Sequence, residues 1–215
     1  MMYQLLRKLT PVIVLVILGI FAIRFAGSVI PTDTISVVNT PTTLAVQPIP
    51  SEPINVRISA SLVAMTPQQL AKSADIVIQG VARGPAHSQW NTPKGFRQPN
   101  VEIGSNNLIY TDTPVEVNRY LKGAQSSKVL TVRTLGGQVG ADRVRFSEEA
   151  ELQPGQPVVL FLTQNDVMTG KYGPVHYMVA GAGQGKYVIE GTQAKTPSDE
   201  RSLAALTALI AASQH

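Results

Sequence analysis

The chain has three histidines, His87, His176 and His215, which are the side chains best suited to acid–base chemistry near neutral pH. A hydrolytic triad needs a histidine that activates a serine and is itself oriented by a carboxylate. The Gly-x-Ser-x-Gly turn that carries such a serine in many hydrolases does not occur in the sequence. His176 alternates with Tyr177 in a strand-like segment, which is typical of a packing or surface residue. The spacing of the histidines indicates no metal site, so we predict neither a catalytic residue nor a bound metal.

Residues 181–186, Gly-Ala-Gly-Gln-Gly-Lys, have the composition of a phosphate-binding loop. Their spacing fits neither standard pattern, because no Ser or Thr follows Lys186 and the third glycine of a dinucleotide fingerprint would fall at Lys186. The next residues indicate a strand, so no helix N-terminus is at hand to hold a phosphate. We expect the turn of a hairpin between strands at 175–180 and 186–190, and no cofactor.

Glu148, Glu149 and Glu151 form an acidic cluster just before Pro154-Gly155. Paired carboxylates can perform acid–base catalysis or bind calcium. Calcium loops usually supply more ligands at set spacings. We therefore interpret the cluster as a solvated turn.

A long polar segment, Gly84–Asn107, contains the only tryptophan of the chain, Trp90, with Lys94, Phe96 and Arg97 close by. Long loops without regular structure are usually either functional or disordered in compact domains. Aromatic and arginine side chains dominate the energetics of many interfaces. We predict that this segment carries a binding site around these four residues. The alternative is a mobile insertion in which Trp90 packs back onto the domain.

The segments that must position these residues are mostly β-like, and the most apolar of them outside the N-terminus is Gln156–Thr163. Turn residues flank it on both sides, which indicates one short strand. Val158, Leu160 and Leu162 share one face, and Val159 and Phe161 share the other. A strand with two apolar faces needs cover on both, so it belongs inside a barrel or a sandwich.

Other segments complete a mainly β domain over residues 61–215. The fold class we expect is a small antiparallel, OB-like barrel or a sandwich of about six strands with two flanking helices. A capping box at Thr66–Gln69 predicts a helix that ends near Ser73, and Thr196–Asp199 predicts a second helix over 197–212. Gly136-Gly137 and Gly140 predict a flexible turn. Strands are expected at 75–83, 108–121, 128–135 and 144–146, and 56–62 is left open.

Residues 1–30 form a targeting segment, in which Arg7 and Lys8 precede an apolar run over 11–23. As a helix this run is about 20 Å long, which fits a signal peptide cleaved near Ala26–Ser28 and leads to a secreted protein. Alternatively, the helix extends to residue 30 with Arg24 snorkelling to the interface, as a single-pass transmembrane anchor in the cytoplasmic membrane. We favour the anchor, because Arg24 fits a cleavage site poorly. The positive residues keep the N-terminus cytoplasmic and place the domain outside.

Composition sets further limits. The chain contains no cysteine, which excludes disulfides and thiolate metal sites. The net charge is +4, yet beyond residue 30 there are 15 basic residues (18 less Arg7, Lys8 and Arg24) against 14 acidic ones. Such a nearly neutral domain has no basic face for nucleic acid. Residues 31–60 are rich in Pro and Thr and predict an extended tether between anchor and domain.

An ordered set of short motifs resembles a known but uncharacterised module of exported bacterial proteins, which in some of them lies beside a matrixin-type zinc protease domain. The resemblance covers roughly residues 66–191. The zinc-binding helix of those proteases is absent here, so the resemblance implies the accessory module without the enzyme. A more distant likeness, to the cysteine-rich, OB-like netrin and tissue-metalloproteinase-inhibitor barrels, bears on fold class alone. The motifs are ADIVIQGV at 74–81, VEV at 115–117, LKG at 121–123, TVR at 131–133, LGGQVG at 135–140, PGQ at 154–156, VLFL at 159–162 and QGK at 184–186.

These observations lead to a main hypothesis for the function. The chain is expected to be a membrane-tethered, extracytoplasmic and non-catalytic binding module, with an envelope or secreted protein as its partner. One alternative, from the resemblance alone, is an accessory or inhibitor of extracellular proteolysis. A second alternative is an unrecognised hydrolase.

Overall fold

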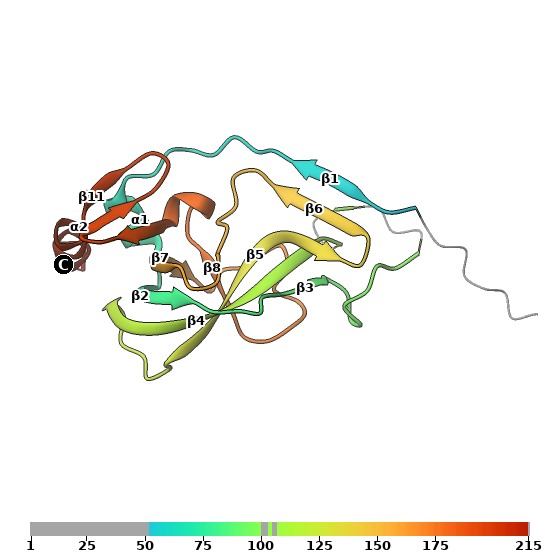
Figure 1. The fold of residues 1–215 in the computed structure, drawn as a ribbon, viewed down its shortest axis with the longest axis horizontal. Coiled ribbons are helices and arrows are strands. Elements are labelled where there is room, and N and C mark those ends of the chain that lie inside the picture. Colours follow the sequence, from blue (N-terminus) through green and yellow to red (C-terminus); the bar gives the residue numbers. More distant parts are fainter. Residues whose placement is uncertain (1–51, 100–102, 105–106, 215) are drawn as a thin grey trace, which may run out of the picture. The chain divides into compact units, whose positions relative to one another are not determined.

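The computed structural model describes residues 52–99, 103–104 and 107–214 of the chain (Figure 1). The expected anchor at 1–30 and the tether up to residue 51 lie outside these residues. Within the described part, no helix is both long and apolar enough to span a membrane. The described residues therefore cover most of the expected domain together with residues 52–60.

Five strands close into a barrel in the order β2, β4, β5, β8, β7 and back to β2. A mainly β barrel is thus confirmed, and closure of the ring decides against the sandwich. The expectation of a wholly antiparallel barrel is wrong, because β5 and β8 run parallel. The reason is geometric: strand directions cannot alternate around a closed ring that has an odd number of strands. The strands are Ile76–Ala82 (β2), Ile109–Lys122 (β4), Val129–Val139 (β5), Pro157–Thr163 (β7) and Tyr177–Val179 (β8).

Strand β7 has the central role that its sequence predicts. Val158, Leu160 and Leu162 belong to the cluster that fills the barrel, whereas Val159 and Phe161 belong to a second cluster outside it. All five side chains are fully buried. Because side chains alternate along a strand, one apolar run supplies the inner core and the outer core together.

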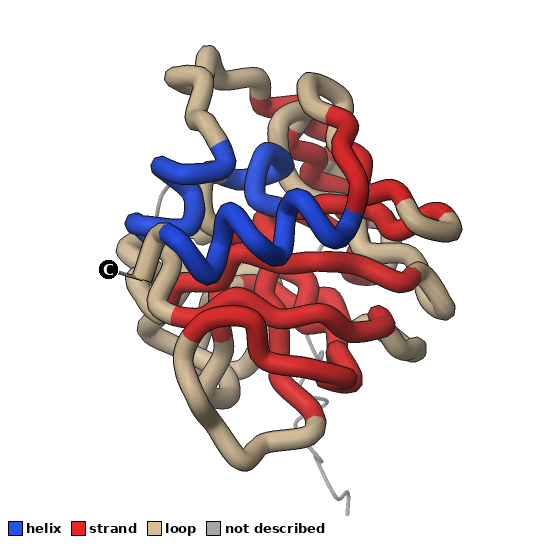
Figure 2. The backbone as a smooth tube through the Cα atoms, turned by 90° about the vertical axis from the view of Figure 1, so that its left-hand side faces the viewer, coloured by secondary structure: helices blue, strands red, loops and turns tan. Residues whose placement is uncertain are grey.

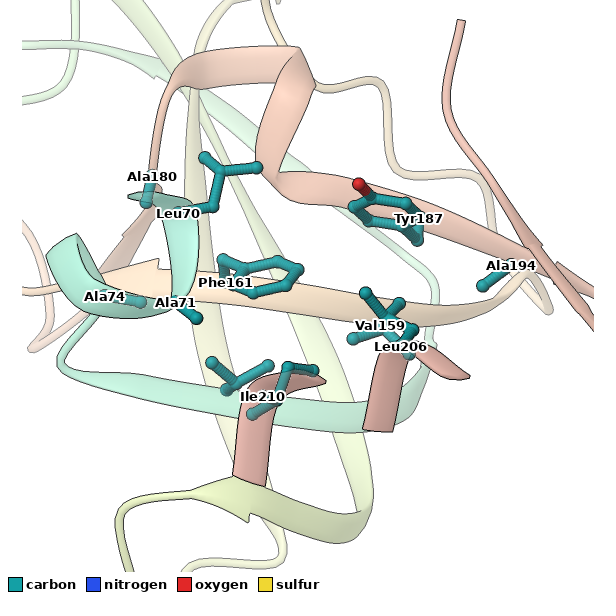
Figure 3. Close-up of a cluster of buried hydrophobic side chains, with 11 residues drawn as sticks. Leu70, Ala71, Ala74, Val159, Phe161, Ala180, Tyr187, Ala194, Leu206 and Ile210 are labelled. Atoms are coloured by element: carbon teal, nitrogen blue, oxygen red, sulfur yellow. The ribbon is translucent and has the colours of Figure 1, made fainter. Parts of the chain in front are cut away.

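Two helices cover the outer face of β7: α1 (Pro67–Ser73) and α2 (Leu203–Ala212). Figure 2 shows them side by side across the strands. The close-up in Figure 3 shows Leu70 of α1 and Ile210 of α2 approaching Phe161 from both sides. The predicted capping box of α1 is confirmed, since Thr66 N–H donates to the Gln69 side chain over 2.7 Å and Gln69 N–H donates to the Thr66 hydroxyl over 3.2 Å.

The second helix begins later than predicted, at Leu203. Residues 193–202 instead form a hairpin of β10 (Gln193–Lys195) and β11 (Glu200–Ser202). The hydroxyl of Thr196 accepts the backbone N–H groups of Ser198 and Asp199, so a turn produces the same local signature as a helix cap. The cap of α2 is Ser202, whose hydroxyl accepts the N–H of Ala205 over 3.1 Å.

The predicted hairpin through residues 181–185 is also wrong. β8 and β9 (Lys186–Glu190) do not pair with each other; both pair with β7, β8 at Leu162–Thr163 and β9 at Val158–Leu160. The connection between them is a short 3₁₀ helix over Ala182–Gly185. The same edge of β7 therefore pairs with two strands. Its C-terminal end pairs with β8 of the barrel, and its N-terminal part pairs with β9, from which β10 and β11 extend the sheet.

A second layer extends from the barrel and consists of β1 (Asn55–Ile58), β3 (His87–Trp90), β6 (Asp142–Phe146) and the adjoining ends of β4 and β5. β1 falls in the segment that the sequence leaves open, and it pairs in parallel with β6. The predicted turn lies at Gly140, between β5 and β6. Gly136 and Gly137 instead form a kink inside β5, where both have positive φ, 92° and 139°. This backbone, which only glycine adopts readily, redirects β5 from the barrel into the second layer.

Candidate functional site

The barrel interior becomes polar at one end of β4 and β5. Thr111 and Thr113 lie on the same face of β4 as the buried Val115, and Thr134 lies on the same face of β5 as the buried Val132. Thr113 and Thr134 are only 2% and 8% exposed. The threonines therefore continue the inward-facing rows beyond the last valines, and the barrel ends in a polar mouth.

A cavity of about 510 Å³ opens at this end, and we call it the barrel-mouth pocket. It is lined by the three threonines, the β5 kink, β6, Ser147 and residues 149–152, with Arg57 of β1 and the exposed Ala86 also contributing. Small-molecule sites commonly have volumes of roughly 300–1,000 Å³. The barrel-mouth pocket thus has the size of a small-molecule site and an unusually polar lining for the end of a barrel core.

Residues 147–152 form one wall of the pocket and are held in place at several points. Ala150 is buried within the barrel core. The N–H of Ser147 donates to the carbonyl of Ile58 over 3.0 Å, and the N–H of Gly183 donates to the carbonyl of Glu148 over 2.8 Å. The Lys186 ammonium donates to the carbonyl of Glu151. These contacts join the wall to β1, to the 3₁₀ helix over Ala182–Gly185 (η1) and to β9, so the intervening Glu149 is fixed beside the cavity.

The carboxyl group of Glu149 is the titratable group most altered by this position. Burial raises its pKa from 4.5 to about 7. Hydrogen bonds from the N–H groups of Ala150 and Leu135 act in the opposite direction, and the charge of Asp166 raises the pKa further. The interpretation of the acidic cluster as a solvated turn holds for the exposed Glu148 and Glu151 but is wrong for Glu149.

Two exposed arginines lie side by side in the pocket lining. Arg57 of β1 and Arg145 of β6 are register partners in the parallel ladder, and both line the cavity. Within residues 52–99, 103–104 and 107–214, neither guanidinium is part of an ion pair. The pocket therefore combines two unneutralised cations, a row of hydroxyls and a carboxyl group that is partly protonated at neutral pH.

The structure does not gather the predicted site residues into one surface. Trp90 is 1% exposed and packs with Ile109 and Val144 in a core of the second layer. Arg97 is paired with Asp142 at 3.0 Å and also donates to the carbonyl of Glu52. The packed alternative describes Trp90, which comes from a β-strand and not from a loop.

Lys94 and Phe96 are the two members of the predicted set that remain exposed, Phe96 to 69%. They lie in the turn after β3, where the Thr92 hydroxyl donates to the carbonyl of Phe96 over 2.8 Å. A lone exposed aromatic residue next to one lysine is a common surface feature. No part of the predicted four-residue site lines the barrel-mouth pocket.

His176 lies in a polar network outside the barrel. Its Nε2 lies 2.9 Å from a carboxylate oxygen of Asp166, and its Nδ1 lies 2.8 Å from the carbonyl oxygen of Pro174. Both partners are acceptors, so the two hydrogen bonds form together only when the imidazole carries both protons. Burial would raise the pKa of Asp166, but hydrogen bonds from Thr169, His176 and Met168 outweigh it and the pKa is lower than usual. Both ring nitrogens of His176 thus have partners in the 166–174 segment.

The same network rests on a buried ion pair between Arg133 and Asp112, with bonds of 2.7 and 2.9 Å. The Arg133 guanidinium lies 3.5 Å from the ring centre of Tyr110 and donates to the carbonyls of Thr169 and Tyr172. Arg133 thus fastens the 164–176 segment onto the barrel. Among the described residues, no group of three or more His, Asp and Glu side chains is placed to hold a metal ion.

The pocket residues carried little signal in the sequence. The alternation of Arg143, Val144 and Arg145 indicates a strand with an exposed face, but nothing marks its partner as Arg57. Glu149 is one of three similar glutamates, and only its tertiary burial sets it apart.

Comparison with known proteins does not identify a family. No protein-family model matches the chain, and no curated protein matches its sequence.

Proposed function

We propose that the chain is a non-catalytic binding module that lies outside the cytoplasmic membrane, held there by its N-terminal segment, and that the barrel-mouth pocket is its ligand site. The observation that carries this proposal is the pocket itself. It is a cavity of about 510 Å³ with hydroxyl, guanidinium and carboxyl groups that converge on one space. Such convergence of a few polar groups in a formed cavity is typical of ligand sites.

We further propose that the barrel is of the OB type. Counted along the chain, its five strands pair in the cyclic order 1-2-3-5-4, with the third and fifth parallel. In OB barrels, the face of the second and third strands is a common binding surface. Here these strands are β4 and β5, which supply the threonines of the pocket. This support is an analogy between folds and bears on the place of the site, not on the identity of the ligand.

A second candidate is acid–base catalysis at Glu149, which corresponds to the hydrolase alternative. It is favoured by one observation, a carboxyl group in a cavity with a pKa of about 7. We place it second because the other glutamate that lines the pocket, Glu151, is exposed and the buried groups beside Glu149 are hydroxyls. The further alternative, an accessory or inhibitor of extracellular proteolysis, rests on the motif resemblance alone.

The binding proposal is tested with the full-length chain in a non-ionic detergent. Trp90 is the only tryptophan and is buried, so its fluorescence reports unfolding of this domain without a label. A panel of neutral, anionic and cationic compounds of one to two sugar rings or amino acids is screened by thermal shift. A ligand present at 100 times its Kd stabilises a protein by about 2.7 kcal/mol. In a domain of this size that raises Tm by at least about 5 °C.

Two tryptophan substitutions locate the bound compound. Ala86→Trp places a large side chain at an exposed position that lines the pocket and should abolish the shift. Ala124→Trp, at an exposed position away from the pocket, is the matched control and should keep the shift. If no compound stabilises the protein, or if Ala86→Trp leaves every shift intact, the pocket is not the ligand site. If a compound is consumed during incubation, catalysis at Glu149 is the better proposal.

Membrane attachment is tested separately, by mass spectrometry of the native protein. An intact N-terminal segment in the membrane fraction supports the anchor. A mature terminus near Ser28 or Val29 supports secretion after cleavage and overturns the anchor.

A further inference from the structure

Arg57 and Arg145 place two positive charges next to each other in the pocket lining. They are direct neighbours across the parallel β1–β6 ladder, where strands lie about 4.8 Å apart. Like charges directly opposite each other on neighbouring strands are destabilising. An anion bound between two such guanidinium groups removes the repulsion and gains charge-assisted hydrogen bonds.

The next strand contributes no side chain beside this pair. Gly136 of β5 is the register partner of Arg145, so Arg57, Arg145 and Gly136 form one row across β1, β6 and β5. All three line the barrel-mouth pocket. The third member of the row has no side chain, and a Cβ added to Gly136 would lie 2.7 Å from the carbonyl oxygen of Val144. The backbone of β6 therefore packs closely over β5 at this point, and Arg57 and Arg145 supply the side chains of the row.

From this arrangement we infer that the barrel-mouth pocket selects an organic anion, whose carboxylate or phosphate group binds between Arg57 and Arg145. This inference rests on the proposed binding function. Arginine suits the role because its planar fork of N–H donors matches both carboxylate and phosphate.

The rest of the cavity indicates that the ligand is larger than an inorganic ion. Thr113 and Thr134, with Ser147 at the 147–152 wall, place hydroxyl groups around the same space. Hydroxyl groups both donate and accept, so they suit the hydroxyl or amide groups of a sugar acid, a sugar phosphate or an acylated amino acid. A ligand of this class puts its anionic group on the arginines and its polar body toward the threonines.

Glu149 makes the binding dependent on pH. When its carboxyl group is protonated, the two arginines face only the exposed Glu151 within the pocket. As pH rises through about 7, Glu149 ionises and its negative charge opposes that of the ligand. Binding should therefore be strongest below neutral pH and about tenfold weaker at pH 8. The charge that acts on the Glu149 carboxyl group is that of Asp166 from the β7–β8 connection, which is paired with His176. The charged groups that line the pocket together with Glu149 are Arg57 from β1, Arg145 from β6 and Glu151 from its own segment.

The experiment uses calorimetry on the full-length chain in non-ionic detergent at pH 6, with three probes that share one ring: glucuronate, glucose 6-phosphate and glucose. At least one of the two anions should bind ten times more tightly than glucose, and the comparison between them separates carboxylate from phosphate. Arg57→Gln and Arg145→Gln should each lower the affinity at least tenfold. Arg143→Gln, on the same strand but paired with Gln138 outside the pocket, is the matched control and should not change it.

Two further measurements keep the result interpretable. Without ligand, Arg145→Gln should have an unchanged or higher Tm, because it removes a like-charge contact, and a lower Tm contradicts the assigned repulsion. Glu149→Gln should bind the anion equally at pH 6 and pH 8, and persistence of the pH dependence overturns the role of Glu149.

The remaining outcomes separate this inference from the proposed function. If a neutral or cationic compound binds in the pocket and is blocked by Ala86→Trp, while neither anion binds better than glucose, the inference is wrong and the binding function stands. If no compound of the wider panel binds, the proposed function fails first.

Discussion

Replacing Glu149 with glutamine should stabilise the protein at pH 8 and leave its stability nearly unchanged at pH 5. The pKa of this carboxyl group is about 7 in the folded protein, against an ordinary value of 4.5, mainly because of burial. The folded state therefore holds the proton more tightly than the unfolded chain. By linkage, this group makes the wild-type protein less stable as pH rises from 4.5 to about 7, and the loss is complete above the folded pKa. Glutamine cannot ionise, so the variant escapes this loss.

The size of the effect follows from the two pKa values. The step from 4.5 to about 7 corresponds to at most about 3 kcal/mol in the free energy of unfolding. Glu149 is not fully buried, and its partial exposure to solvent lowers this figure, so we expect a gain of about 1–3 kcal/mol at pH 8. For a domain of this length, such a gain raises Tm by roughly 2–10 °C.

The assay is urea unfolding at pH 5, 6, 7 and 8, followed by the fluorescence of Trp90. The midpoint for Glu149→Gln should separate from that of the wild type as pH rises, with an unchanged slope on urea concentration. Glu148→Gln removes the exposed neighbouring charge and is the matched control, which should follow the wild type. Parallel midpoints for Glu149→Gln and wild type across the whole pH range would refute the argument that burial governs this group.

Three other predictions test the core and the outer network. Leu160→Ala should cost about 2–5 kcal/mol in urea unfolding, because the side chain is fully buried inside the barrel, whereas Val129→Ala at a 57% exposed position should cost under about 0.5 kcal/mol. Arg133→Met should lower the free energy of unfolding by about 3–5 kcal/mol, because it leaves Asp112 buried without its partner. Adding Asp112→Leu should restore part of this stability. Additive losses in the double-mutant cycle would contradict coupling between the two residues. The emission of Trp90 should be blue-shifted and protected from acrylamide in the native protein, and a solvent-like spectrum would show that the second layer does not bury it.

Features with a local cause were predictable from the sequence. The capping box at Thr66 depends on four consecutive residues, and it forms as predicted. β7 was predictable because alternation along a strand assigns Val159 and Phe161 to one face and Leu160 to the other without knowledge of any partner. The capped pattern at Thr196 shows the limit of such signals, since a turn and a helix start satisfy the same backbone groups, and the pairing of β10 with β11 decided between them.

The remaining features depend on contacts between segments that are distant in the sequence. Ring closure with five strands requires a parallel pair, and nothing within β5 or β8 announces it. The candidate site has the same origin: Arg57 and Arg145 become neighbours only through the β1–β6 ladder, and Glu149 differs from the adjacent Glu148 only through what covers it. The amino-acid sequence alone shows which segments are apolar and which charges are present. Which of these charges meet across a cavity, and with what pKa, was determined by packing between segments, because electrostatic and burial effects depend on distance in space and not on separation along the chain.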